Sequence, residues 1–465
     1  MLYIFKSTSL LTFKSQKSIS NAMPKSVLLL TIDSLRYESL QGDKTTADGE
    51  GKLRCTSTSF TRAFATGPGT TSSFPALLTG TQPLSHGGLG PLAESRARVS
   101  TRLAKAGHTT GAFHCNPFLS THFNYDVGYD EFKDYQNPLM GIATKIFPRG
   151  IEINNPKLRR VDDLFHITDA IKKSYQLVKG KPRPYVSAEV ITDDTIEWID
   201  EIDQPFFCWT HYMDVHHPCF PPEEYRERYD ITDVTQMDVS EWYSSLLRNP
   251  ETLSEEEITN LETLYEAAIE YTCDQIDRIV SHLKNTGRYD DTLIILTSDH
   301  GELFGEYGQY GKPERMYDEL LRVPLVVANG PDYLEGATDD LVSLLDVPPL
   351  IHDALGLEIS NEYEGRVPGK DEPREYAMAE HEVEGNVIVG ARSEDWLYEG
   401  DKINDEHRLF NLRNGFERVD RDHPEADTVR DAVLARLDEL NIEAEYLQGD
   451  METDVEDRLE DLGYL

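Results

Sequence analysis

Residues 27–33 read Val-Leu-Leu-Leu-Thr-Ile-Asp, an almost wholly apolar run that ends on a carboxylate. A continuous apolar run of this length predicts a central strand of a parallel sheet, buried on both faces. Three further runs have the same form, at Phe206–Thr210, Thr292–Thr297 and Val323–Val327. Because helical stretches alternate with these strands, the sequence predicts an α/β domain with a mostly parallel central sheet flanked by helices.

Polar side chains follow three of these predicted strands. Asp33 ends the first, His211–His217 follow the second, and Asp299 and His300 follow the third. Open α/β sheets bind ligands at the carboxyl edge of their strands, and carboxylates with imidazoles can hold a divalent cation. A single Asp or His at a strand end is more often structural, but three such clusters together favour a metal site.

The stretch Thr66–Gly80 reads Thr-Gly-Pro-Gly-Thr-Thr-Ser-Ser-Phe-Pro-Ala-Leu-Leu-Thr-Gly. A glycine-rich turn, four hydroxyl residues and an apolar run predict a loop that leads into a helix N-terminus. Such a terminus suits an anionic ligand, because its backbone N–H groups are unpaired. Taken alone, the stretch reads as a capped helix with spare hydroxyls. Beside a metal ion, one of the hydroxyls could act as a nucleophile.

The rest of the chain predicts helices at Ser187–Ile202, from Ser254 to Gly287 and at Leu341–Leu355. From Glu375 onward, short alternating strands and a last helix predict a small antiparallel α+β subdomain. The expected divisions are a disordered or mis-assigned extension at 1–22, a catalytic domain at 23–357 and a C-terminal subdomain at 358–465. Insertions are expected in the catalytic domain at about 124–185 and 219–253, the second as a mobile acidic lid.

The composition is strongly acidic: 84 Asp and Glu against 45 Lys and Arg give a formal net charge of -39 over 465 residues. An acid content spread along the whole chain indicates a halophilic source, since high salt screens the self-repulsion. No basic face is present for nucleic acid. No apolar run is long enough for a membrane span and no cleavable signal is apparent, so a cytoplasmic location is expected. The five widely spaced cysteines predict reduced thiols, and the oligomeric state stays open.

Several motifs of the chain resemble the sulfatase family of the alkaline phosphatase superfamily. Thr70–Gly80 aligns without gaps with the family's nucleophile signature C-x-P-S-R-x-x-x-L-T-G. The other matching motifs are Thr31–Arg36 with T-I-D-D-L-R, His86-Gly87 with H-G, His216-x-Pro218 with H-x-P, Ser298–Glu302 with S-D-H-G-E, Lys312 before Arg322–Leu325, Ser343–Leu350 with s-L-v-D-l-x-P-T-L, and the ending Arg458–Tyr464.

The resemblance implies an alkaline-phosphatase-like fold and a role for individual residues. It makes Asp33, Asp299 and His300 ligands of one divalent ion (Ca, Mn, Mg or Zn), with Thr70 as nucleophile and further contact to the ion. It also implies that His216 and Lys312 bind the anionic group or protonate the leaving oxygen. The alternatives for these two are a hydrogen-bonding loop histidine and a solvated surface lysine.

The chain departs from the family pattern at several of these positions. Thr70 stands in place of the cysteine that sulfatases convert to formylglycine, Ser72 in place of the signature proline and Phe74 in place of the arginine. Ser34 replaces a second metal-binding aspartate, and residues 114–117 replace G-K-W-H. A threonyl ester cannot eliminate its sulfate as a formylglycine hydrate does, so water or an acceptor must cleave it. With one carboxylate fewer, a single ion is expected.

Three functions follow as hypotheses. The first is a metal-dependent hydrolase of sulfate or phosphate esters, acting on an anionic small molecule or glycan. The second is phosphodiesterase or phosphotransferase chemistry, for which members of the superfamily use threonine. The third is a catalytically inactive protein that binds anionic or sulfated glycans, which the losses at Ser34 and Phe74 favour.

Overall fold

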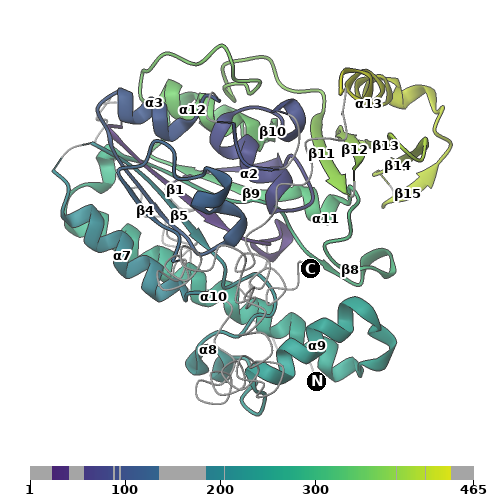
Figure 1. Ribbon diagram of the computed structural model, residues 1–465, viewed down its shortest axis with the longest axis horizontal. Coiled ribbons are helices and arrows are strands. Elements are labelled where there is room, and N and C mark those ends of the chain that lie inside the picture. Colours follow the sequence, from purple (N-terminus) through teal and green to yellow (C-terminus); the bar gives the residue numbers. More distant parts are fainter. Residues whose placement is uncertain are drawn as a thin grey trace, which may run out of the picture.

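The computed structural model describes residues 24–40, 57–86, 90–93, 96–135, 185–203, 205–383, 385–413 and 415–440. The extension expected at 1–22 lies outside these ranges, as do residues 136–184 of the first expected insertion. Within them, a large sheet carries helices on both faces, and a small second sheet lies at its side (Figure 1).

The central sheet has eight strands in the order β10-β2-β9-β6-β1-β5-β3-β4. Their bounds are β10 (Leu341–Ser343), β2 (Ser57–Phe64), β9 (Arg322–Ala328), β6 (Thr292–Ser298), β1 (Ser26–Ile32), β5 (Phe206–Tyr212), β3 (Thr109–Phe113) and β4 (Glu131–Lys133). The strands from β6 to β4 are parallel, whereas β9 runs antiparallel to both of its neighbours. The prediction of a mostly parallel sheet is confirmed.

All residues of β1 are buried, as its apolar run predicts. Leu28 and Leu30 pack on α7 (Ala188–Asp200) and α10 (Glu255–Asn285). Val27 and Leu29 point to the opposite face, which is covered by α2 (Thr70–Thr79), α3 (Val99–Lys105) and α12 (Val347–Ala354). Figure 1 shows these two helical layers on either side of the sheet. The alternation along the strand therefore builds two cores, one on each face.

The helix expected at Leu341–Leu355 begins later than predicted. Residues 341–343 form β10, because Leu341 pairs with Arg62 at the edge of the central sheet. After a single 3-10 turn at Leu344–Asp346, α12 begins at Val347. The prediction at the start of α10 is confirmed, since Ser254 and Glu257 form a capping box.

The two expected insertions contain regular structure. Residues 131–133 of the first form β4, which pairs with β3 at the edge of the central sheet. The second, expected as an acidic lid at 219–253, holds α8 (Glu223–Arg228) and α9 (Gln236–Arg248). Val239, Tyr243 and Leu246 of α9 are buried, so this helix is anchored in the core through one face.

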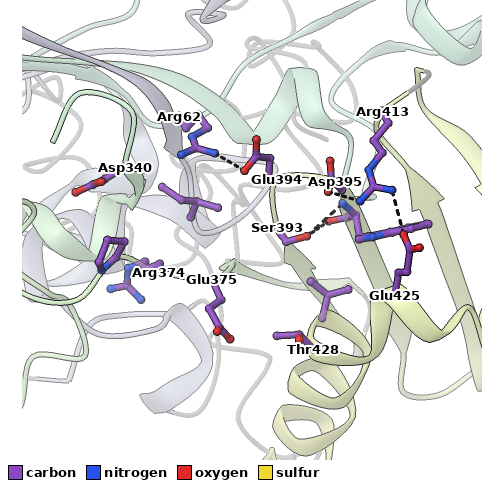
Figure 2. A pocket seen from close by; sticks show the side chains of 14 residues that line it. Arg62, Asp340, Arg374, Glu375, Ser393, Glu394, Asp395, Arg413, Glu425 and Thr428 are labelled. Carbon is purple, nitrogen blue, oxygen red and sulfur yellow. Dashed lines mark hydrogen bonds and ion pairs between the residues drawn. The ribbon is translucent and has the colours of Figure 1, made fainter.

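The C-terminal subdomain has the predicted antiparallel sheet, covered by α13 (Asp427–Glu439). Its strands are β11 (Ala377–Val383), β12 (Asn386–Arg392), β13 (Trp396–Asp401), β14 (Glu406–Asn411) and β15 (Glu417–Val419). A cavity of about 580 Å³ lies where it meets the central sheet. Figure 2 shows ion pairs in this cavity, with Arg62 of β2 on Glu394 at 3.0 Å and Arg413 bridging Asp395 and Glu425. In the described residues, every helix is too short or too polar to cross a membrane.

Candidate active site

Two carboxylates and an imidazole meet at the carboxyl edge of the central sheet. Ile32 of β1 pairs with Ser298 of β6, so the next residues, Asp33 and Asp299, leave the sheet side by side. His300 follows directly, and the side chains of Asp33, Asp299 and His300 are fully buried. One ligand atom from each lies within 4.8 Å of the others. The structure thus brings together the three residues that the sequence predicts as metal ligands.

The hydroxyl of Thr70 lies against all three side chains. Thr70 is the first residue of α2, and its Oγ1 lies 3.0 Å from Asp299 Oδ2, 3.3 Å from Asp33 Oδ2 and 3.4 Å from His300 Nε2. The helix N-terminus holds this hydroxyl at the point where the carboxylates converge. Thr70 thus contacts all three candidate metal ligands.

Two other hydroxyls of the same stretch form hydrogen bonds to backbone carbonyls. Ser72 Oγ donates to the Gly69 carbonyl at 3.0 Å, and Thr66 Oγ1 donates to the Ser72 carbonyl at 3.1 Å. The loop fits tightly: a Cβ at Gly67 would lie 2.3 Å from the Ser72 side chain and 2.7 Å from the Glu380 carbonyl. Only glycine leaves room for this path, which aims Thr70 at the site.

The charges of the cluster favour a cation. Burial and the neighbouring Asp33 raise the pKa of Asp299 to about 7. Burial also opposes ionisation of Asp33, but the nearby His216, His211 and His300 together hold its pKa well below the usual range. Among the described residues, neither carboxylate forms an ion pair with lysine or arginine. Two buried carboxylates with one imidazole are a donor set that fits a divalent cation.

Lys312 lies one step away from the cluster. Its Nζ donates to Ser34 Oγ at 3.1 Å and to Glu302 Oε2 at 3.3 Å. Ser34 Oγ in turn donates to Asp33 Oδ1 at 2.8 Å. Although burial opposes it, the Lys312 ammonium lowers the pKa of Glu302 below its usual value. Lys312 is therefore a partly buried cation, paired with Glu302, rather than a solvated surface lysine.

His216 follows β5 and is also buried. Its Nδ1 lies 2.6 Å from the His217 carbonyl, which can only accept, so Nδ1 carries the proton. Burial, and after it the Lys312 ammonium, lowers the pKa of His216 to about 3. At neutral pH this ring is uncharged and its Nε2 is an acceptor. In this form Nε2 can accept a hydrogen bond and so orient a donor in the site.

His217 provides a test of burial in this region. Its ring stacks on Tyr243 at 4.6 Å, neither ring nitrogen has a hydrogen-bond partner among the described residues, and burial lowers its pKa to about 4. Because the folded pKa lies below the unfolded value of about 6.5, stability is lost as pH falls from 6.5 toward 4. From pH 8 to pH 4, we expect the free energy of unfolding of wild type to fall by roughly 3 kcal/mol more than that of His217→Phe.

The measurement is the free energy of unfolding in denaturant at several pH values and constant salt. The phenylalanine keeps the stacking partner of Tyr243, so the two proteins should differ little at pH 8 and diverge below pH 6.5. Parallel curves for both proteins across the acid range would contradict the assignment.

Some residues of the site were not predicted as such. Asn116 donates from Nδ2 to Asp33 Oδ2 at 3.0 Å, and His211 Nε2 lies 3.4 Å from the same oxygen. The sequence marks His211 only as part of a polar cluster at a strand end, and Asn116 only as a departure from the family pattern. Glu302 is part of a recognised motif, but its link to Lys312 appears only in the structure.

Comparison with known proteins finds a matching family and a similar fold. The family model described as Sulfatase matches residues 25–357. An uncharacterized sulfatase of Escherichia coli is 30% identical over 159 residues, which cover 32% of this chain and only 31% of that protein. An arylsulfatase of Clostridium perfringens is 20% identical, with 74% of this chain and 77% of that protein covered.

The fold is similar to that of a phosphonate monoester hydrolase from Silicibacter pomeroyi. The two share 21% sequence identity and superpose with a TM-score of 0.63, covering 89% of this chain and 94% of the other. The family model spans the central sheet and the whole Asp33, Thr70, Asp299 and His300 cluster. The chain therefore belongs to the sulfatase family, with a threonine where the family signature has its cysteine.

Proposed function

We propose that this protein is a metal-dependent hydrolase of sulfate or phosphate esters in which Thr70 is the nucleophile. The observation that supports the proposal is the position of the Thr70 hydroxyl, between 3.0 and 3.4 Å from one atom each of Asp33, Asp299 and His300. A hydroxyl at a helix N-terminus beside a cation site has the means to lose its proton and to face an anion.

One divalent ion, Ca, Mn, Mg or Zn, would be held by Asp33, Asp299, His300 and Thr70. Such an ion favours the alkoxide of Thr70 and neutralises charge on the transferred group. A single ion is proposed because Ser34 stands where a second metal-binding aspartate is expected. Its hydroxyl accepts from Lys312 instead, so an ammonium supplies positive charge on that side.

In the proposed reaction, the Thr70 hydroxyl gives its proton to water, and Oγ1 attacks the phosphorus or sulfur atom as the bond to the leaving oxygen breaks. The leaving oxygen takes its proton from the Lys312 ammonium or from water that Lys312 orients. A water molecule then attacks the same atom as the bond to Thr70 Oγ1 breaks, with its O–H oriented by a hydrogen bond to His216 Nε2. The proton that this water loses passes to Thr70 Oγ1, and Lys312 regains from solvent any proton that it gave up. The anionic ester, a small molecule or a glycan, would be bound by these same groups.

Threonine favours phosphoryl transfer over sulfuryl transfer. A phosphothreonyl ester can be opened by water or passed to an acceptor hydroxyl, whereas the formylglycine elimination route is closed. Phosphodiesterase or phosphotransferase chemistry is therefore the second candidate. The third, binding of anionic glycans without turnover, is supported by Phe74 in place of the signature arginine but not by the intact cluster around Thr70.

The test is turnover of nitrophenyl sulfate, nitrophenyl phosphate, bis(nitrophenyl) phosphate and a phosphonate monoester. The assays are run in molar salt, because the net charge of -39 leads us to propose a halophilic protein. We expect a chelator to abolish turnover of the preferred ester, and one of Ca²⁺, Mn²⁺, Mg²⁺ or Zn²⁺ to restore it. Equal turnover before and after chelation would exclude the metal, and no turnover of any ester under any ion would favour the binding protein.

A further inference from the structure

His211 lies on β5 beside Thr31 of β1, because the two residues are register partners in the sheet. Both side chains are fully buried, and neither is used in the proposed reaction. Asp33 follows β1 two residues after Thr31, and its Oδ2 lies 3.4 Å from His211 Nε2. We infer that His211 is a positioning residue that holds Asp33 for cation binding, and that Thr31 and Trp209 fix its tautomer. This inference rests on the proposed function.

The tautomer follows from counting donors. The indole Nε1–H of Trp209 can only donate, and it donates to Thr31 Oγ1 at 3.0 Å. Thr31 must direct its own proton to another acceptor. The nearest is His211 Nδ1 at 3.0 Å, against 3.4 Å for the Thr210 carbonyl. Because Nδ1 accepts, the neutral imidazole carries its proton on Nε2, the nitrogen that faces Asp33.

The carboxylate receives donors on both oxygens. Oδ2 receives Asn116 Nδ2 at 3.0 Å and faces His211 Nε2, while Oδ1 accepts from Ser34 Oγ at 2.8 Å. Asp299 lies close by, so without these donors repulsion between the two carboxylates would turn Asp33 away from the cluster. Partners of this kind orient a metal-binding carboxylate and typically change metal affinity 10- to 100-fold when they are removed.

Aromatic rings hold the imidazole in place. Phe74 meets His211 edge to face at 4.9 Å, and it packs on Trp209 at 5.4 Å. His114 stacks on Trp209, with ring centroids 4.9 Å apart. Phe74 occupies the position of the signature arginine. In this chain the residue at that position therefore packs against the hydrogen-bonded chain of Trp209, Thr31 and His211, called here the relay. The ring cannot rotate without disturbing this packing.

The experiment measures the Kd of Mn²⁺ for the full chain, stripped with a chelator and titrated in molar salt while free Mn²⁺ is followed by electron paramagnetic resonance. The variants are Thr31→Val, Thr31→Ser, His211→Phe and a double variant that combines Thr31→Val with His211→Phe. We expect Thr31→Val and His211→Phe each to raise the Kd about 10- to 100-fold, and Thr31→Ser to stay near wild type. The double variant should be no weaker than His211→Phe, because Thr31 acts through His211.

The matched control is Thr272→Val. Thr272 is also fully buried and donates to a carbonyl, that of Ala268 at 2.8 Å within α10, so it tests the loss of a buried hydroxyl away from the site. Its Mn²⁺ affinity should equal that of wild type. If Thr31→Val also binds Mn²⁺ as wild type does while losing only stability, the positioning role is wrong. If His211→Phe does not fold, the comparison of Thr31→Val with Thr31→Ser still tests the positioning role.

The outcomes separate this inference from the proposed function. Wild-type affinity in every variant would overturn the relay and leave the metal site standing. Failure of wild type to bind Mn²⁺, Ca²⁺, Mg²⁺ or Zn²⁺ would overturn both. Weaker binding in Thr31→Val, recovered in Thr31→Ser, supports both.

Discussion

Thr70→Ala is expected to lower kcat/KM by at least about 10⁴-fold on whichever ester the wild-type protein turns over best. The reason is that Thr70 Oγ1 is the only hydroxyl of the stretch Thr66–Ser73 shown within 3.4 Å of Asp33, Asp299 and His300 among the described residues. Without this hydroxyl, the proposed threonyl ester cannot form. The measurement is steady-state turnover in molar salt with the restoring metal ion present.

Two variants of the same stretch serve as controls. Thr70→Ser keeps a hydroxyl at the first position of α2 and should retain turnover within about 100-fold of wild type. Thr71→Ala removes the neighbouring hydroxyl and should leave kcat/KM within a few-fold. Wild-type turnover in Thr70→Ala would show that the attack comes from water or another group. A large loss in both Thr70→Ala and Thr71→Ala would instead point to a folding defect.

The central strands and the main cluster could be predicted from the sequence because their signals are local. Val27–Ile32 and Thr292–Thr297 are continuous apolar runs, and each is followed at once by its carboxylate. Since both strands are parallel and central, their ends must fall at one edge of the sheet. The gapless register of Leu78-Thr79-Gly80 selects Thr70 from four hydroxyl residues, and the structure places that hydroxyl at the cluster.

The supporting contacts could not be predicted, because they join residues far apart in the chain. Thr31 and His211 are 180 positions apart, and their bond depends on β1 and β5 being neighbours in an exact register. Asn116 reaches Asp33 from 83 positions away. The helix expected at Leu341 fails for the same reason: pairing with Arg62 of β2 outweighs the local helical pattern.

Phe74→Arg, which restores the signature residue of the family, is expected to destabilise the protein by about 3–5 kcal/mol and not to create sulfatase activity. The Phe74 side chain is fully buried, and its ring packs on Trp209 and His211. A guanidinium there would be buried among these aromatic rings, which are called here the aromatic wall. A buried charge without a partner is costly. The measurement is the free energy of unfolding in denaturant, together with turnover of nitrophenyl sulfate.

Phe74→Leu separates loss of shape from burial of charge. Leucine leaves a cavity but no unpaired charge, so it should cost about 1–3 kcal/mol and keep the fold. If Phe74→Arg is as stable as wild type and gains turnover of the sulfate ester, its side chain has reached the anion, and the aromatic wall is not required. If Phe74→Arg is destabilised and inactive while Phe74→Leu binds Mn²⁺, the role of position 74 in this chain is to pack against His211. The loss of the signature arginine and the presence of Thr70 are then parts of one rebuilt site, in which packing replaces a charge that the family places next to its nucleophile.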